Sequence, residues 1–144
     1  MNKVFQKFLI AADHGGYELK ELIKKEINVD WQDLGTYSEE SVDYPDLAKE
    51  MTKRIDKGTV GILVCGTGQG MCMSANKEAH IRAALCWSSK VTTLAREHND
   101  ANVMCLGGRV TDHQKALKYV KLFLSTEFEG GRHGRRVDKF SKKL

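Results

Sequence analysis

The apolar run Val60–Val64 is followed at once by the glycine-rich segment Cys65–Gly70, with the sequence CGTGQG. An unbroken apolar run of this kind is typical of a strand that is buried on both faces of a parallel sheet. The next residues, 71–77, are predicted to form a helix. Cys65 is therefore expected at the carboxyl end of a central strand, where glycines turn the chain into the unpaired N–H groups that begin a helix. This arrangement can activate a thiol and bind an oxyanion within one small volume.

Strand-like and helix-like segments alternate five times along the chain, without a repeat or a second zone of composition. This alternation predicts an α/β fold with one parallel sheet and helices on both of its faces. We expect a single domain over residues 1–144, a three-layer αβα sandwich with a Rossmann-like sheet in the order 2-1-3-4-5, and a C-terminal helix. The five expected strands are residues 8–12, 29–34, 60–64, 81–86 and 101–106.

Local signals indicate where some of the helices begin and end. Pro45 suits the first position of a helix, because its missing N–H has no partner there. Gly58 is expected to end the same helix, and a later helix is expected from about Ser88 to Glu97. Asp13 directly follows the first strand, so its carboxylate could either cap the next helix or face a ligand.

Composition narrows the class of protein. The chain has 144 residues, of which 41% are hydrophobic and 29% charged, as in ordinary globular proteins. It has no apolar run long enough for a membrane span and no signal-peptide core, so we expect a cytoplasmic protein without membrane association. Its cysteines form no CxxC pair and match no zinc template. They are expected to be reduced thiols, with Cys86 and Cys105 in the core.

The topology predicts which segments meet. In an open parallel sheet, ligands bind beyond the carboxyl ends of the strands, at the point where the strand order reverses. In the expected order this point lies between the first and third strands. Asp13 and His14 follow the first strand and Cys65–Gly70 follows the third. The sequence therefore predicts that these two segments lie together.

The glycine loop fits an anion hole better than a nucleotide-binding motif. Its glycines follow G-x-G-x-G after the third strand, which is not the dinucleotide fingerprint, and no Gly-Lys-Ser/Thr of a P-loop is present. Arg109, Arg132 and Arg136 could grip a phosphate, the last two on one face of a helix. A solvated basic tail is the alternative, since residues 130–144 hold a net charge of +5 and the rest of the chain −1. A Cys–His hydrolase also stays open, with His98 or His14 as the histidine.

Seven spaced motifs together resemble the ribose-5-phosphate isomerase type B family, and the resemblance covers nearly the whole chain. The motifs are Asp13-His14-Gly15, Asp43-Tyr44-Pro45, Cys65–Gly70, Ala75-Asn76-Lys77, the HNDAN segment that begins at His98, Gly108-Arg109-Val110, and the segment from Gly130 to Val137 that carries Arg132 and Arg136.

The resemblance implies interconversion of ribose 5-phosphate and ribulose 5-phosphate through an enediolate, without metal or cofactor. It implies Cys65 as the base, the backbone N–H groups from Gly66 to Gly70 as the oxyanion hole, Thr67 as an aid to proton transfer, and His98 in opening the sugar ring. The remaining implied contacts are Asp13, His14, Tyr44, Gly66, Gly68, Gly70 and Asn99 for the sugar, and His14, Arg109, Arg132 and Arg136 for the phosphate.

The family resemblance also implies a homo-oligomer, a dimer or tetramer with active sites shared between subunits. The basic segment at about residues 130–144 is expected to pack at that interface. One branch of the family uses a glutamate just after the loop in place of the cysteine; here that position is Met71, so the cysteine chemistry applies. We expect Met71–Met73 to pack in the core and Cys72 to be non-catalytic. Because this chain holds both Cys65 and the His98 motif, it needs no second type of subunit.

The sequence leaves three rival interpretations of the function. The substrate could be a six-carbon sugar phosphate such as allose 6-phosphate, which would need only a roomier pocket. The protein could be a non-catalytic phosphate-binding module, in which case Cys65→Ala would leave its function intact. Nucleic-acid binding through residues 130–144 is disfavoured, because the tail has Phe140 but no array of stacking residues and the rest of the chain is nearly neutral.

Overall fold

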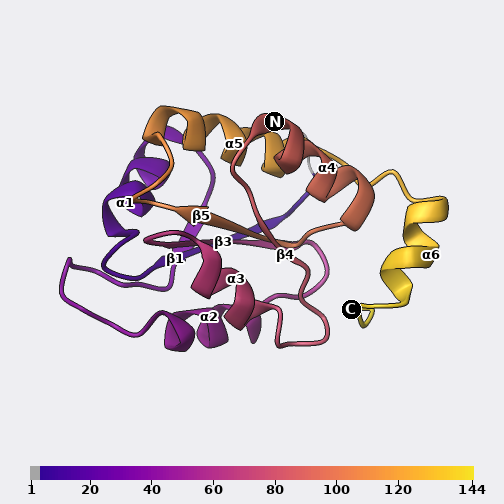
Figure 1. Ribbon diagram of the computed structural model, residues 1–144, viewed down its shortest axis with the longest axis horizontal. Helices are drawn as coiled ribbons and strands as arrows, with labels where there is room; N and C mark the ends of the chain where they lie inside the picture. The colour runs from indigo at the N-terminus through magenta and orange to yellow at the C-terminus, as the bar shows by residue number, and fades with distance from the viewer. Residues whose placement is uncertain (1–3) are drawn as a thin grey trace.

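The computed structural model describes residues 4–144, which form a five-stranded parallel sheet between two layers of helices (Figure 1). The predicted three-layer α/β architecture is confirmed. In chain order the elements are β1 (Lys7–Ala12), α1 (Tyr17–Glu26), β2 (Trp31–Asp33), α2 (Tyr44–Thr52), β3 (Thr59–Cys65), α3 (Gln69–Ala75), β4 (Ala83–Leu85), α4 (Ser89–Asn99), β5 (Val103–Gly107), α5 (His113–Ser125) and α6 (Arg132–Asp138).

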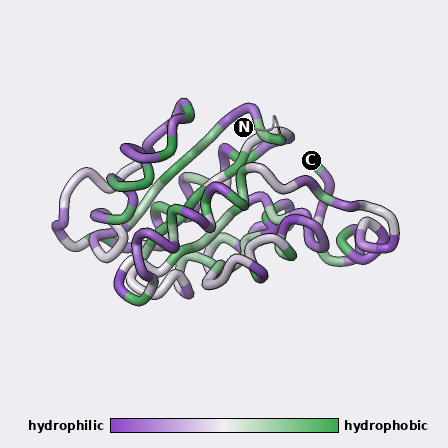
Figure 2. The backbone as a smooth tube through the Cα atoms, turned by 90° about the horizontal axis from the view of Figure 1, so that it is seen from above, coloured by the Kyte–Doolittle hydropathy of each residue, from purple (hydrophilic) through white to green (hydrophobic). Residues whose placement is uncertain are grey.

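Alternating side chains of the strands build two hydrophobic cores, one on each face of the sheet. Ile10 and Ile62 point into the core beneath α1, α4 and α5, whereas Leu9 and Leu63 point into the core that α2 and α3 cover. Figure 1 shows α1, α5 and α4 on one side of the strands and α2 and α3 on the other. Figure 2 shows the hydrophobic colour concentrated in the central strands, while α6 is mostly hydrophilic.

The strand order is β2-β1-β3-β5-β4, so the predicted order 2-1-3-4-5 is wrong in its last two places. All five residues of β5 are buried, whereas the three residues of β4 are only half-buried. The more fully buried strand occupies the inner position next to β3, and the shorter one forms the edge. The reversal of order between β1 and β3 is unaffected, so the predicted ligand edge stays where it was expected.

Several predicted element boundaries also differ. Helix α2 begins at Tyr44, which makes Pro45 its second residue, and it ends at Thr52. Gly58 does not end that helix; it lies in the turn before β3 with a φ of +84°, a value that glycine adopts without strain. Helix α4 starts where it was expected, because the Ser88 hydroxyl accepts a hydrogen bond from the Val91 N–H at 3.0 Å. It continues to Asn99, two residues beyond the predicted end at Glu97.

The core assignments are correct for some sulfur side chains and wrong for one. Cys86, Cys105 and Met71 are buried, as predicted. Met73 is 65% exposed, which corrects the expectation that residues 71–73 all pack inside. Helix α3 has only one covered face, and Met73 lies on the other. Within the described part of the chain, no helix is both long and apolar enough to cross a bilayer.

A buried ion pair fastens α1 to the end of β2. The Lys20 side chain is fully buried, and its ammonium group lies 2.7 Å from Asp33 Oδ2 and 2.6 Å from the Thr36 carbonyl oxygen. Burial of Asp33 would by itself raise its pKa, but hydrogen bonds from Lys20, Lys24 and the Gly35 N–H outweigh that effect and lower the pKa below its ordinary value of 3.8. The carboxylate is thus stabilised in its charged form by the fold.

We expect Asp33→Asn to lower the free energy of unfolding at pH 7 by about 3 kcal/mol, because the buried Lys20 would keep only the partly exposed Glu21, at 3.2 Å, as a counter-charge. Since folding lowers the pKa of Asp33, its contribution is present above the unfolded pKa and is lost as the pH falls through the folded one. Urea unfolding at pH 7 and at pH 3 checks both points. The wild type should lose more stability on acidification than the variant, and an equal loss in the two proteins would contradict the assignment.

Candidate active site

Cys65 ends β3 between two neighbouring strands, β1 and β5. It is only 5% exposed, and its sulfur accepts a hydrogen bond from the Gly68 N–H at 3.2 Å. Gly68 can point this N–H back at the sulfur because its φ of +82° lies in the left-handed region, and a Cβ there would lie 2.9 Å from the Leu106 carbonyl carbon. The glycine loop thus contacts the sulfur directly through its backbone.

The turn after β1 lies directly against the glycine loop, as the topology predicts. The Asp13 N–H donates to the Val64 carbonyl at 3.1 Å, and a Cβ on Gly15 would lie 3.0 Å from the Gly66 nitrogen. Asp13 does not cap the N-terminus of α1. Its Oδ1 accepts hydrogen bonds from the N–H groups of Gly15 at 2.9 Å and Gly16 at 3.2 Å, which fixes the shape of the turn.

Tyr44 borders the same loop from another side, and His14 bonds the segment just before Tyr44. A Cβ on Gly70 would lie 2.5 Å from ring atoms of Tyr44 and 2.9 Å from its hydroxyl, so the ring is packed against the loop backbone. Tyr44 is still 38% exposed. His14 Nδ1 accepts a hydrogen bond from the Val42 N–H at 3.3 Å. A neutral His14 therefore carries its proton on Nε2, where it can donate to an anion.

Arg109 completes this edge from the end of β5. Its N–H donates to the Gly66 carbonyl at 3.0 Å, and the Gly108 N–H donates to the Cys65 carbonyl at 2.8 Å. The guanidinium carbon lies 3.3 Å from the position of a Cβ on Gly15. The carboxyl edge of the sheet thus gathers a thiol, backbone N–H groups, a hydroxyl, a carboxylate and a cation in one place. We call this the Cys65 group: Asp13, His14, Tyr44, the loop 65–70 with its exposed Thr67, and Arg109.

The other predicted site residues lie at the opposite end of the molecule. Helix α4 follows β4 and leads into β5, so it runs antiparallel to the strands and its last residues, His98 and Asn99, reach the amino edge of the sheet. The Asn102 N–H bonds the Arg82 carbonyl at 3.0 Å at this edge. Helix α6 lies beside α4 here (Figure 1) and presents Arg132 and Arg136 to solvent.

His98 has two neighbours that sequence reasoning missed, His133 and Glu129. The rings of His98 and His133 are stacked with their centroids 4.1 Å apart. Glu129 Oε1 lies 3.9 Å from His98 Nε2 and 3.6 Å from His133 Nε2. Burial lowers the pKa of His133, and the positive charges of His98, Arg132 and Arg136 lower it further against the opposing effect of Glu129. The only signal in the sequence is the position of His133 between Arg132 and Arg136.

These residues form the second cluster, which we call the His98 group: His98, Asn99, Glu129, Arg132, His133 and Arg136. Three of them offer ligand atoms within 4.8 Å of one another, namely His98, Glu129 and His133. The two rings are inclined by only 13°, so their nitrogens do not converge on one point as the ligands of a tetrahedral metal must. Arg132 and Arg136 also disfavour a cation here. We therefore interpret the cluster as a stack of two histidine rings beside Glu129.

The two groups cannot meet within one chain. They lie at opposite edges of the sheet, and the seven residues of β3 alone span about 20 Å at roughly 3.3 Å per residue. His98 of the same chain is therefore out of reach of Cys65, which excludes it as the histidine of a Cys–His pair within one subunit. The two groups are therefore separate clusters on one chain.

The other thiols differ in their reactivity. Burial raises the pKa of the Cys86 thiol to about 12, so it stays protonated near neutral pH. A hydrogen bond with Cys72 together with burial raises the pKa of Cys105 well above its ordinary value. The same hydrogen bond lowers the pKa of the half-buried Cys72. Cys86 and Cys105 are thus packing residues, and Cys65 is the thiol that faces the cluster of polar groups.

Comparison with known proteins places the whole chain among sugar-phosphate isomerases. A family model described as Ribose/Galactose Isomerase matches residues 8–140. Ribose-5-phosphate isomerase B of Escherichia coli is 40% identical over 138 residues, which cover 92% of this chain and 93% of the relative.

Solved structures agree with this result. The structure of ribose 5-phosphate isomerase B from Anaplasma phagocytophilum has a TM-score of 0.92 and 39% identity, covering 97% of this chain and 99% of that chain. The enzyme from Mycoplasma genitalium with bound ribulose 5-phosphate has a TM-score of 0.84 and 44% identity, covering 92% of each chain.

Proposed function

Because the chain belongs to the ribose/galactose isomerase family, we propose that it interconverts ribose 5-phosphate and ribulose 5-phosphate by moving a proton between C2 and C1 of the sugar. The chain is an aldose–ketose isomerase, since relatives of this activity are 40% identical or more over most of its length. The observation that carries the proposal is the Cys65 group, which combines a potential base with the backbone N–H donors of the glycine loop.

Cys65 is proposed as the base of this reaction. The proton next to a carbonyl is weakly acidic, so its removal needs both a base and stabilisation of the oxyanion that forms. The Gly68 N–H donates a hydrogen bond to the sulfur of Cys65. Backbone N–H groups from Gly66 to Gly70 would bind the oxyanion of the enediolate, an effect of about 3–4 kcal/mol for a single donor. Without substrate, those of Gly68 and Gln69 bond the Cys65 sulfur and the Thr67 hydroxyl. Thr67 is exposed beside them, and its hydroxyl would move the proton between the two oxygens.

The remaining residues bind and prepare the substrate. Asp13 and Tyr44 border the loop and would bind the sugar hydroxyls. His14 and Arg109 lie on the same edge as donors for a phosphate or a sugar oxygen. His98 and Asn99 of the partner subunit would open the furanose ring and bind its hydroxyls, and Arg132 and Arg136 of the partner subunit would bind the phosphate. Because the phosphate is bound away from the reacting carbons C1 and C2, it would hold these carbons in place next to Cys65.

We further propose a homo-oligomer in which the His98 group of one copy completes the Cys65 group of the other. Two observations support it. The two groups are separated by the length of the sheet in one chain, and exposed apolar side chains flank the edge strand β4. Phe140 is 61% exposed and Met73 65%, and Phe140 borders a pocket along β4 together with Asn76, Ala83 and Asn99. Residues 130–144 would then pack at the interface, within one folded unit of residues 1–144.

The arginine assignments have a matched control on the same helix. We expect Arg132→Ala and Arg136→Ala each to raise KM for ribose 5-phosphate about 10- to 100-fold, the loss of one charge-assisted contact to phosphate, with kcat much less affected. Arg135→Ala removes an equally exposed charge from the neighbouring position of α6 and should leave KM unchanged. Steady-state kinetics of the three variants with ribose 5-phosphate and with allose 6-phosphate checks this expectation.

Unchanged KM in both Arg132→Ala and Arg136→Ala would contradict the phosphate assignment. Higher kcat/KM of the wild type for allose 6-phosphate than for ribose 5-phosphate would assign the six-carbon substrate instead. Binding of both sugar phosphates without turnover would favour the non-catalytic module.

A further inference from the structure

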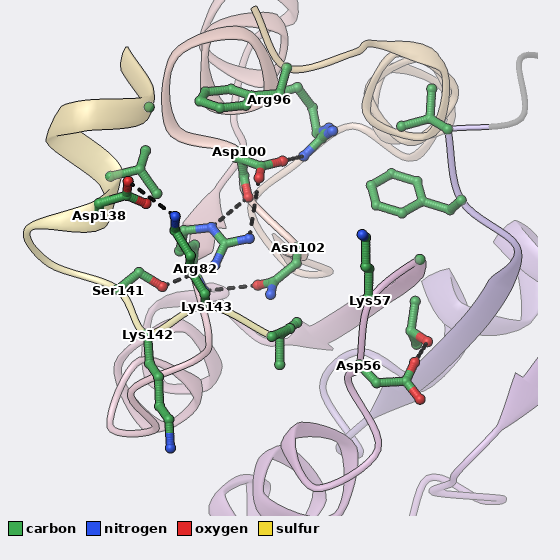
Figure 3. A pocket seen from close by; sticks show the side chains of 18 residues that line it. Asp56, Lys57, Arg82, Arg96, Asp100, Asn102, Asp138, Ser141, Lys142 and Lys143 are labelled. Atoms are coloured by element: carbon green, nitrogen blue, oxygen red, sulfur yellow. Dashed lines mark hydrogen bonds and ion pairs between the residues drawn. The ribbon is translucent and has the colours of Figure 1, made fainter. Parts of the chain in front are cut away.

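A cavity of about 360 Å³ lies at the amino edge of the sheet, at the far end of the strands from Cys65. Its walls come from the start of β3, the starts of β4 and β5, the back of α6 and the C-terminal residues 141–144. Figure 3 shows open space between Lys57 on one side and Arg82, Arg96 and Asn102 on the other. A volume of this size is in the range of small-ligand sites.

Two arginines at this cavity, the buried Arg96 and the half-buried Arg82, share a single carboxylate. Arg96 is only 2% exposed, and its Nη1 lies 3.0 Å from Asp100 Oδ1. Arg82 Nη2 lies 3.5 Å from Asp100 Oδ2. Among residues 4–144, Asp100 is the only carboxylate at ion-pair distance from either guanidinium, so two positive charges face one negative charge. The other carboxylates of the wall, Asp56 and Asp138, pair with Lys7 and Lys143. Burial lowers the pKa of both guanidinium groups, as expected where charge compensation is incomplete.

A third cation faces the same space. Lys57 is exposed, and Figure 3 shows its ammonium group pointing into the opening. Among residues 4–144, no carboxylate lies within ion-pair distance of it. Other lysines of the wall differ from it, since Lys143 pairs with Asp138 at 3.6 Å and Lys142 points away from the opening in Figure 3. The ring of Phe5 adds an apolar wall, 4.8 Å from the Arg96 guanidinium.

We propose that this cavity is a second ligand site, which binds a small polyanion with carboxylate or phosphate groups between Lys57 and the pair Arg82 and Arg96. The ligand would supply the counter-charge that Asp100 alone does not provide. The cavity belongs neither to the Cys65 group nor to the exposed arginine face of α6. It is therefore distinct from the proposed substrate site.

The position of α6 links this cavity to catalysis. At 100° per residue, Arg132 and Arg136 lie on one side of α6, whereas Gly134, Val137 and Asp138 lie on the opposite side, and these three line the cavity. Ser141, just after the helix, accepts a hydrogen bond from Arg82 Nη1 at 2.9 Å. An anion bound in the cavity would thus contact α6 on the side opposite Arg132 and Arg136, the arginines proposed to bind the substrate phosphate. This effect on KM rests on the proposed function, but the binding itself does not.

Calorimetric titration of the full chain with citrate and with inorganic pyrophosphate tests the site. A Cys65→Ala background with saturating ribose 5-phosphate keeps the substrate site filled without turnover. We expect Lys57→Glu to weaken binding of the anion about tenfold or more, because it replaces an attraction by a repulsion. Lys53→Glu makes the same charge change at an exposed position outside the cavity and should bind like the unmodified background.

Equal binding in Lys57→Glu and Lys53→Glu would overturn the site, and so would the absence of binding at millimolar anion in the background protein. Preference for citrate or for pyrophosphate would identify a carboxylate or a phosphate ligand. In active enzyme, the anion should change KM for ribose 5-phosphate in Lys53→Glu and not in Lys57→Glu. Binding without any change of KM would overturn the link through α6 and leave the substrate assignment untouched.

Discussion

Replacement of Cys65 by alanine is expected to lower kcat for ribose 5-phosphate at least about a thousandfold, within the range that one general acid–base group contributes. The sulfur is the group at the end of β3 that can accept the proton, and the N–H groups around it stabilise charge but cannot take a proton. KM should change little, because Asp13, Tyr44 and the arginines would still bind the sugar phosphate. Formation of ribulose 5-phosphate, measured with EDTA present, checks the prediction.

Cys72→Ala is the matched control for Cys65→Ala. It removes a thiol from α3, the helix that follows the same loop, and should retain most of the turnover. Both variants must unfold at a temperature close to that of the wild type, so that a loss of folding is not mistaken for a loss of the base. Turnover that survives in Cys65→Ala would mean that another residue carries the proton, and the central assignment would be wrong.

The sequence was sufficient to predict that Asp13 and His14 lie beside the loop 65–70, because this depends on local chemistry and on one topological rule. Tyr44 was expected there only from the family resemblance. The side chains of the apolar run 60–64 can be buried on both faces only in the middle of a sheet. The glycines that follow must turn the chain at the strand end. Parallel strands bring such ends together at one edge, so Asp13 and Gly66 meet although they are distant in the chain. None of this requires knowledge of side-chain packing.

The features that could not be predicted from the sequence depend on which of several similar segments packs in a given place. Residues 81–86 and 101–106 are similarly apolar, and only packing decides that β5 is buried next to β3 while β4 forms the edge. Met73 looked like a core residue because methionine usually is one, but α3 covers the sheet with one face only. The stack of His98 on His133 joins two elements that no local pattern connects.

The separation of the Cys65 and His98 groups leads to the second large effect, a recovery of activity by mixing two inactive variants. Cys65→Ala and His98→Ala should each be nearly inactive as homo-oligomers. A mixed dimer should regain about half of the wild-type activity, because one of its two symmetry-related sites combines the intact Cys65 of one chain with the intact His98 of the other. Co-expression with two different affinity tags, followed by sequential purification, isolates the mixed species for assay.

A second pair of variants serves as the control for this recovery of activity. Cys65→Ala and Asp13→Ala both affect the Cys65 group, which one chain provides alone. In their mixed dimer each site lacks either the base or the carboxylate, so the activity should stay as low as in the separate variants. If instead each chain held a complete site, both mixtures would be equally inactive. Recovery in the first mixture and not in the second therefore requires that the two halves of the site come from different subunits.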